Sequence, residues 1–202
     1  VTGAVPVANG GTALTSGFKN GVDPRPLSKP IIINGDMTIA QRNTSVTGKT
    51  SSGYYTCDRI QLAMNDAGTY TVTQETSTSG NAYANGFAEA YRIDCTTADA
   101  SVAADSQLFI KYKVEARDAQ VFKKGTANAE KFTLAFWVKS NKTGTGQVNL
   151  RDEVNTRQCS ATYTISSANT WEHKICNFAA DTTGALPSTN VEGFGIEWYL
   201  AA

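Results

Sequence analysis

Hydrophobic and polar residues alternate along most of the chain with the period of two that is typical of β-strands. The alternation is clearest in residues 131–140, which place four large apolar side chains on one face. Apolar residues on both sides of Asn34-Gly35, a turn dipeptide, predict a short hairpin over 31–42. The same alternation predicts further strands at 58–65, 68–76, 86–95, 107–116, 147–151, 159–165, 170–178 and 193–202.

One segment has a helical signature. Residues 117–125 carry Asp118 near the start, basic residues near the end and Gly125 as a stop signal, which predicts about two helical turns. Because no helices separate the strands, a doubly wound α/β fold is not expected. The pattern predicts an all-β protein, an antiparallel jelly-roll-like β-sandwich with one short helix.

Residues 1–29 differ in composition from the rest of the chain and predict an extended N-terminal arm. Glycines and closely spaced prolines, which favour extended backbone, dominate this segment. Its few hydrophobic residues cannot form a core alone, so we expect partner chains to cover them; they are Val5, Val7 and Leu14. A flexible linker is the alternative interpretation. The sandwich domain is expected to occupy residues 30–202.

The charge is balanced, with 18 basic and 18 acidic residues. Without a basic field, neither nucleic acid nor a lipid surface is expected as a partner. The apolar runs are too short to cross a bilayer, so no membrane insertion is expected. The single histidine, His173, and four cysteines without a C-x-x-C pair form no zinc pattern. We expect no metal and no cofactor, and we expect His173 to be partly buried in a strand.

A disulfide between Cys159 and Cys176 is conceivable, because these residues flank a candidate hairpin. Pairing Tyr163 with His173 in that hairpin, however, places the two cysteines on opposite faces. Free thiols that act as small buried hydrophobes are the favoured interpretation.

Several stretches together resemble phage tail-fibre and receptor-binding proteins. "PVANGGTALTSG" (6–17) is similar to segments at the head of many tail-fibre domains, and "IINGDMTIAQR" (32–42) resembles the opening of the domain that follows. Residues 123–140 and 163–174 resemble central strands of the same carbohydrate-binding-like sandwich. The resemblance covers about 5–202. It implies a β-sandwich on a trimeric fibre that contacts the host surface, commonly a glycan.

The chain departs from this family in two ways. Family members usually continue beyond "IEWYLAA" (196–202) with strands that complete the sandwich, and Ala13 stands where glycine is frequent. A chain that starts at Val1 and stops at Ala202 is expected to be a processed or incomplete piece. Its last strand would then present an unpaired edge, unless other residues cover it.

Signatures of catalysis are missing from the sequence. No G-x-S-x-G elbow occurs, and residues 43–50 lack the first glycine and the strand-to-helix context of a phosphate loop. Glycan hydrolysis uses two carboxylates at a defined separation. Asp152 and Glu153 are adjacent and point apart in a strand, whereas a distant pair such as Asp152 with Glu197 stays open. We expect no catalytic residues and a protein that is not an enzyme, with a capsule depolymerase as an alternative.

Sugar binding by a sandwich needs an aromatic ring against the apolar face of a pyranose, with polar groups for its hydroxyls. On two of the predicted strands, the residues that alternate with the inward apolar positions point to the opposite face. Together with the charged turn that follows residues 147–151, they offer both an aromatic ring and polar groups. The candidate glycan patch consists of Trp137, Lys139, Arg151, Asp152, Glu197 and Tyr199. Packing of Trp137 under the helix or in a subunit interface is the alternative.

The expected function is that of a bacteriophage virion protein, a tail fibre or receptor-binding module that attaches to a host-surface glycan. We expect a homotrimer, joined to other virion proteins through the N-terminal arm. It would be assembled in the host cytoplasm and would reside in the tail or another external appendage. A purely structural adaptor or appendage of the tail, neck or capsid is the alternative.

Overall fold

The computed structural model describes residues 31–201 of the chain. The chain divides into two units, Val1–Ile31 and Ile32–Ala202, and the strands of the described residues belong to the second. The arm predicted over 1–29, with Val5, Val7 and Leu14, lies outside the described residues.

The second unit is almost entirely β-structure, as the alternation predicts. Its described residues form ten strands, a one-turn α-helix and a short 3-10 helix. The strands are β1 (Ser45–Lys49), β2 (Ile60–Asn65), β3 (Thr69–Thr76), β4 (Glu89–Thr97), β5 (Gln107–Glu115), β6 (Phe132–Val138), β7 (Gly144–Asp152), β8 (Arg157–Ile165), β9 (Glu172–Phe178) and β10 (Glu192–Ala201). The helices are α1 (Asn81–Ala84) and η3 (Asp118–Phe122).

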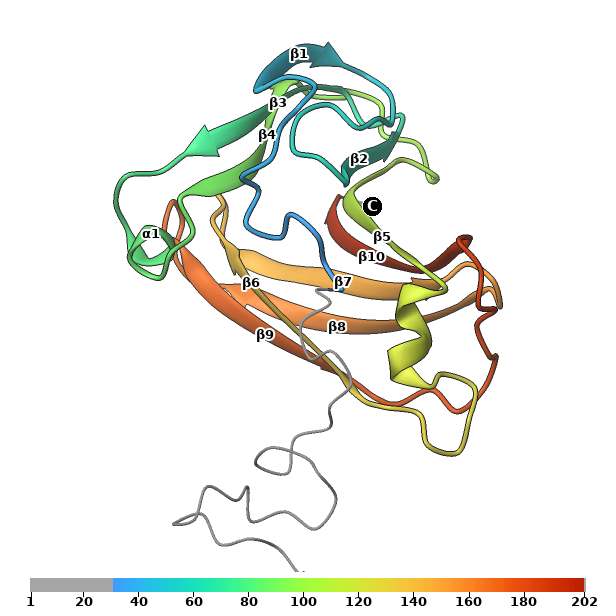
Figure 1. Ribbon diagram of the computed structural model, residues 1–202. Helices are drawn as coiled ribbons and strands as arrows, with labels where there is room; N and C mark the ends of the chain where they lie inside the picture. Colours follow the sequence, from blue (N-terminus) through green and yellow to red (C-terminus); the bar gives the residue numbers. More distant parts are fainter. Residues whose placement is uncertain (1–30, 202) are drawn as a thin grey trace, which may run out of the picture. The chain divides into compact units, whose positions relative to one another are not determined.

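The strands form three antiparallel sheets. The largest has five strands in the order β2-β5-β10-β7-β8, and the others are β1-β3-β4 and β6-β9. Figure 1 shows β1, β3 and β4 grouped near β2, with β6 and β9 running beside β7 and β8. This arrangement confirms the prediction of an all-β, sandwich-like fold.

Both smaller sheets pack on the same face of the five-stranded sheet. On the β2–β5 side, Leu62 and Leu108 pack against Val72 of β3. On the other side, the ring of Phe136 in β6 lies 5.9 Å from the ring of Trp198 in β10. Because Leu108 and Trp198 project from the same side of paired strands, one face of the large sheet builds the core. Its other face points away from both small sheets.

The prediction that the last strand presents an unpaired edge is wrong. β10 lies between β5 and β7 and pairs with both, and the edges of this sheet are β2 and β8. Alternation indicates which residues of a strand face the core, but it does not indicate which strands are neighbours.

The hairpin predicted over 31–42 is not formed. Asn34 instead sits in a turn with a φ of 60°. Its side-chain amide donates to the carbonyl oxygens of Ile39 and Asp58, and its Oδ1 accepts the N–H of Ile39. The side chain thereby bonds to backbone groups that strand pairing would have used, which is a common behaviour of asparagine.

One predicted helix is of another type, and two short elements were not predicted. The helix expected over 117–125 is the 3-10 helix η3, which ends where Lys123 adopts a φ of 51°. β1 and α1 were not predicted, because β1 is short and mostly exposed and α1 is a single turn.

No helix among the described residues has the length and apolar character needed to span a membrane.

The candidate hairpin between Cys159 and Cys176 is also absent, since β8 pairs with β7 and β9 pairs with β6. All four cysteines are free, as predicted. The prediction that they are buried holds for Cys57 and Cys176, whereas Cys95 and Cys159 are exposed.

Leu62→Ala is expected to lower the free energy of unfolding by about 2–5 kcal/mol, because Leu62 is fully buried between two sheets. Leu200→Ala is the matched control: its side chain is 47% exposed, and a loss of about 0.5 kcal/mol is expected. Urea unfolding followed by tryptophan fluorescence measures both. Equal losses would contradict this account of the core.

Candidate ligand-binding face of the five-stranded sheet

The face of the five-stranded sheet that points away from the core, called the outer face below, carries mostly polar side chains. Its strands are in register, so the side chains form rows that cross β5, β10, β7 and β8. The first row is Phe109, Tyr199, Gln147 and Thr162; the second is Lys111, Glu197, Asn149 and Ser160; the third is Lys113, Gly195, Arg151 and Gln158.

An aromatic pair stands in the first row. The rings of Phe109 and Tyr199 are stacked, with centroids 4.8 Å apart and planes inclined by 18°. Both residues are partly exposed. An aromatic platform on a polar face offers apolar surface to a ligand that is otherwise hydrophilic.

Polar groups of fixed orientation lie beside this platform. Gln147, which is exposed, donates from Nε2 to Asn149 Oδ1 over 2.8 Å, and this bond leaves Gln147 Oε1 as an acceptor. Arg151 donates from Nε to Glu153 Oε2 over 3.0 Å, which orients the guanidinium from one edge. The outer face therefore combines rings, an amide and a guanidinium within neighbouring rows.

Lys111 lies at the centre of a charge cluster in the second row. Its Nζ is 2.9 Å from Glu153, 2.8 Å from Glu192 and 3.2 Å from Glu197. The side chains of Lys111 and Glu197 are 11% and 3% exposed. Gly195 leaves the space that the lysine crosses, because a Cβ there would lie 2.9 Å from Lys111 Cε.

The charges of this cluster hold one another in the ionised state. Burial alone would lower the pKa of Lys111, but the carboxylates of Glu192 and Glu153 outweigh burial and raise it. Burial would likewise raise the pKa of Glu153, but hydrogen bonds from Lys111 and Arg151 outweigh burial and lower it. Glu197 is the exception: burial raises its pKa, and Lys111 offsets only part of that effect.

Three of the six residues predicted as a glycan patch lie on the outer face, namely Arg151, Glu197 and Tyr199. The other three lie elsewhere, so the six do not form one patch. Asp152 follows Arg151 in β7 and points to the opposite face, since neighbours in a strand alternate. Asp152 and Glu197 therefore lie on opposite faces of the sheet, which excludes them as a facing pair of carboxylates.

Trp137 lies on the side of β6 that faces away from the five-stranded sheet, and Lys139 directly follows this strand. The ring of Trp137 is 5.1 Å from that of His173, which is exposed rather than partly buried as predicted. Lys139 Nζ lies 5.2 Å from the centre of the Trp171 ring and 3.5 Å from Glu75 Oε1.

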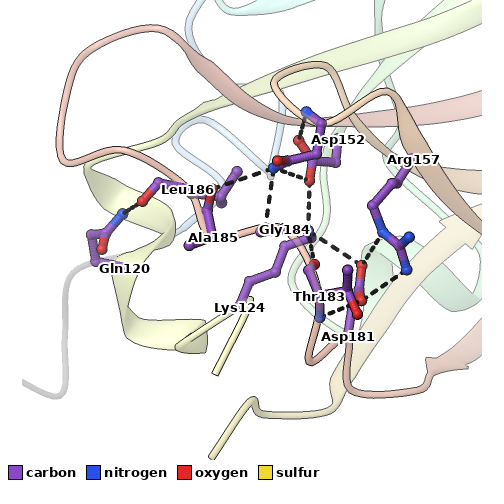
Figure 2. Close-up of polar contacts among 10 residues, drawn as sticks. Gln120, Lys124, Asp152, Arg157, Asp181, Thr183, Gly184, Ala185 and Leu186 are labelled. Atoms are coloured by element: carbon purple, nitrogen blue, oxygen red, sulfur yellow. Dashed lines mark hydrogen bonds and ion pairs between the residues drawn. The ribbon is translucent and has the colours of Figure 1, made fainter. Parts of the chain in front are cut away.

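Asp152 belongs to a buried network that fastens the loop after β9 (Figure 2). Lys124 Nζ lies 2.6 Å from Asp152 Oδ2, and the two side chains are 3% and 2% exposed. The same ammonium donates to the carbonyl oxygens of Thr183 and Gly184 over 2.8 and 2.6 Å. The backbone N–H and the side-chain amide of Asn155 both donate to the Asp152 carboxylate over 2.9 Å. These bonds lower the pKa of Asp152 although its burial acts in the opposite direction.

Asp181 links the same loop to β8. Arg157 donates to both of its carboxylate oxygens over 3.0 Å, and Lys124 Nζ lies 3.2 Å away. The hydrogen bonds from Arg157 lower the pKa of Asp181 to about 2. The cavity beside this network has a volume of about 30 Å³, room for about one or two water molecules and not for a sugar. We infer a structural role for the network.

The sequence did not single out Phe109, Lys111, Gln147 or Asn149 as site residues. Alternation did assign Lys111 outward from β5, but a lone outward lysine is ordinary on a strand. The register between β5, β10 and β7 brings these residues to Tyr199 and Glu197, and no signal within a single strand contains that register.

Among residues 31–201, no three His, Cys, Asp or Glu side chains are arranged to hold a metal ion. The carboxylates of Glu153, Glu192 and Glu197 instead surround the Lys111 ammonium.

Comparison with known proteins gave one structural likeness to report. No protein-family model and no curated protein matches the chain. A solved structure, the enzymatically active domain of tailspike protein 4 from bacteriophage CBA120, resembles 83% of this chain with a TM-score of 0.46 and 12% sequence identity. The chain spans 20% of the length of that structure. A likeness of this degree assigns no reaction, substrate or partner to the chain.

The same comparison overturns the expectation that the protein is not an enzyme, because the matched domain is described as enzymatically active.

Lys124→Met is expected to lower the free energy of unfolding by about 3–5 kcal/mol, because it leaves the Asp152 carboxylate buried without its cation. Lys142→Met, at an exposed turn position, is the matched control with little expected change. The double variant Lys124→Met/Asp152→Asn should recover part of the loss, since no unpaired charge remains. Denaturant unfolding measures all three, and a single variant as stable as the control would contradict the role of the pair.

Acid should weaken the attachment of the loop after β9. The folded-state pKa of Asp181, about 2, lies below its ordinary value of 3.8, so its ionised form stabilises the fold above that value. This contribution is lost as the pH falls from about 4 towards 2. Asp181→Asn should melt below the parent protein at pH 7, and the gap should close near pH 2. Asp36→Asn, at an exposed turn, is the control; a gap that is constant with pH would contradict the assignment.

Proposed function

We propose that the protein is a bacteriophage tail protein that attaches to a polysaccharide of the host surface through the outer face of its five-stranded sheet. The observation that carries this proposal is the stacked pair Phe109–Tyr199, partly exposed in a face that is otherwise polar. The resemblance of residues 6–17, 32–42, 123–140 and 163–174 to tail-fibre proteins supports the placement in a phage tail.

The chemistry of the outer face suits a sugar. The C–H face of a pyranose is apolar and packs on aromatic rings, whereas its hydroxyls need donors and acceptors of fixed direction. Gln147 supplies an acceptor beside the rings, and Arg151 supplies donors one row away. Because Glu153 and Lys111 hold Arg151 and its surroundings in place, little side-chain freedom is lost when a ligand binds.

The proposal includes the assembly. A homotrimer that joins other virion proteins through residues 1–29 would present several outer faces at once. Several linked sites raise the strength of attachment well beyond that of one site, which suits a particle that must hold a cell surface through shallow contacts.

Tyr199→Ala should weaken binding to a surface polysaccharide by about tenfold or more, because it removes half of the platform and the contacts worth about 1.4 kcal/mol or more that accompany it. Binding is measured first on an array of bacterial surface polysaccharides and then by calorimetry with the one that gives a signal.

Trp137→Ala is the control, because it removes an aromatic side chain from the β6–β9 side of the protein. It should bind as the parent protein does, and both variants should keep the parent's melting temperature within a few degrees. Loss of binding in Trp137→Ala alone would move the site to the β6–β9 sheet. Absence of a signal from any polysaccharide would overturn the proposed function.

A further inference from the structure

The first row of the outer face continues beyond the aromatic pair. Tyr199 of β10 is paired with Gln147 of β7, and Gln147 is paired with Thr162 of β8. Phe109 begins the row on β5, where Tyr199 is its partner. We call these residues, Phe109, Tyr199, Gln147 and Thr162, the crossing row, because the line through them runs across the strands.

The crossing row changes in character along its length. It begins with two stacked rings on β5 and β10 and continues with an exposed amide on β7 and an exposed hydroxyl on β8. The Gln147 amide is oriented by its bond to Asn149, which is buried in the second row. A ligand that uses the whole row therefore needs an apolar ring face at one end and hydroxyls towards the other.

The row is longer than one sugar. Neighbouring strands lie about 4.8 Å apart, so the three steps from β5 to β8 span about 14 Å. A single pyranose placed on the rings would leave Thr162 without a contact. A chain of two or three sugar units laid across the strands would reach all four residues.

The two ends of the row differ. At the β2 end, the residue paired with Phe109 is Ala63, which offers neither a ring nor a hydrogen-bonding side chain. At the other end, Thr162 lies on β8, the edge strand of the sheet, with exposed polar residues on both sides along the strand. A chain that leaves the row at β8 therefore meets the sheet edge and can continue.

We propose that the ligand is an extended, internal stretch of polysaccharide that crosses β5, β10, β7 and β8 along the crossing row, rather than a terminal sugar held at the rings. This inference rests on the proposed function and names the form of ligand that the same face takes. In this arrangement Phe109 and Tyr199 pack against the first sugar and supply most of the affinity. Gln147 and Thr162 form hydrogen bonds to the sugar units that follow it along the row.

The test uses the polysaccharide that binds on the array, cut into oligosaccharides of one to six units and separated by size. Calorimetry with the protein of residues 1–202 should show an affinity for the oligosaccharides that rises by about tenfold or more from one unit to three. The affinity should then level off, because a longer oligosaccharide extends beyond the row. The double variant Gln147→Ala/Thr162→Ala should lose most of the gain with length, whatever its affinity for one unit. Tyr199→Ala should weaken binding at every length.

Thr164→Ala is the matched control, because Thr164 is an exposed threonine on β8 whose partner, Thr145, lies outside the row. It should keep the full gain with length. Equal affinity for one unit and for three, or a double variant that keeps the gain, would overturn the crossing arrangement while leaving glycan binding by this face intact. If no polysaccharide binds, the proposed function fails and this inference fails with it.

Discussion

The pleat of β10 determines what each face of the protein can do. Residues of one parity, such as Phe194, Ile196 and Trp198, point into the core, and those of the other parity, such as Glu197 and Tyr199, point to the outer face. Because β10 is bonded to a strand on each side, its register sets the register of four others. A slip by one residue would exchange the two sets and place Glu197 in the core. Core and candidate site are thus specified by the same strand pairings.

Among residues 31–201, two lysines are buried, Lys111 and Lys124, and their surroundings differ. Lys124 lies inside, where a carboxylate and backbone carbonyl oxygens accept its bonds, so it fastens a loop that has no sheet partners of its own. Lys111 lies on the outer face and is surrounded by three carboxylates, two of which also contact Lys113 or Arg151. Burying such charges costs desolvation energy that an apolar pair would not incur. A cluster of this kind fixes side-chain geometry more than it adds stability, which is what a recognition surface needs.

Much of the fold followed from the sequence, because alternation records burial directly. The strands around Leu108, Phe132 and Trp198 could be predicted with their inward faces. What could not be predicted is long-range: the central position of β10, the separation of β8 from β9 and the turn at Asn34 each depend on partners distant in the sequence. The candidate site was the part least predictable from the sequence, because its residues come from strands that are distant in the chain. Trp137 and Tyr199 both read as outward aromatic residues, but only the sheet order reveals that they belong to different faces.

The order of the strands along the chain also affects how the protein is made. The pairs β2–β5 and β7–β8 each contain strands that emerge from the ribosome well before β10, yet the two pairs do not touch within the large sheet until β10 enters between them. Until then, β5 and β7 each expose an unpaired edge, and the apolar side chains that await Phe194 and Trp198 lack their partners. Non-local pairings of this type fold slowly and leave edges open to other chains. Nascent copies held close together are therefore exposed to mispairing with one another, and the entry of β10 ends that interval.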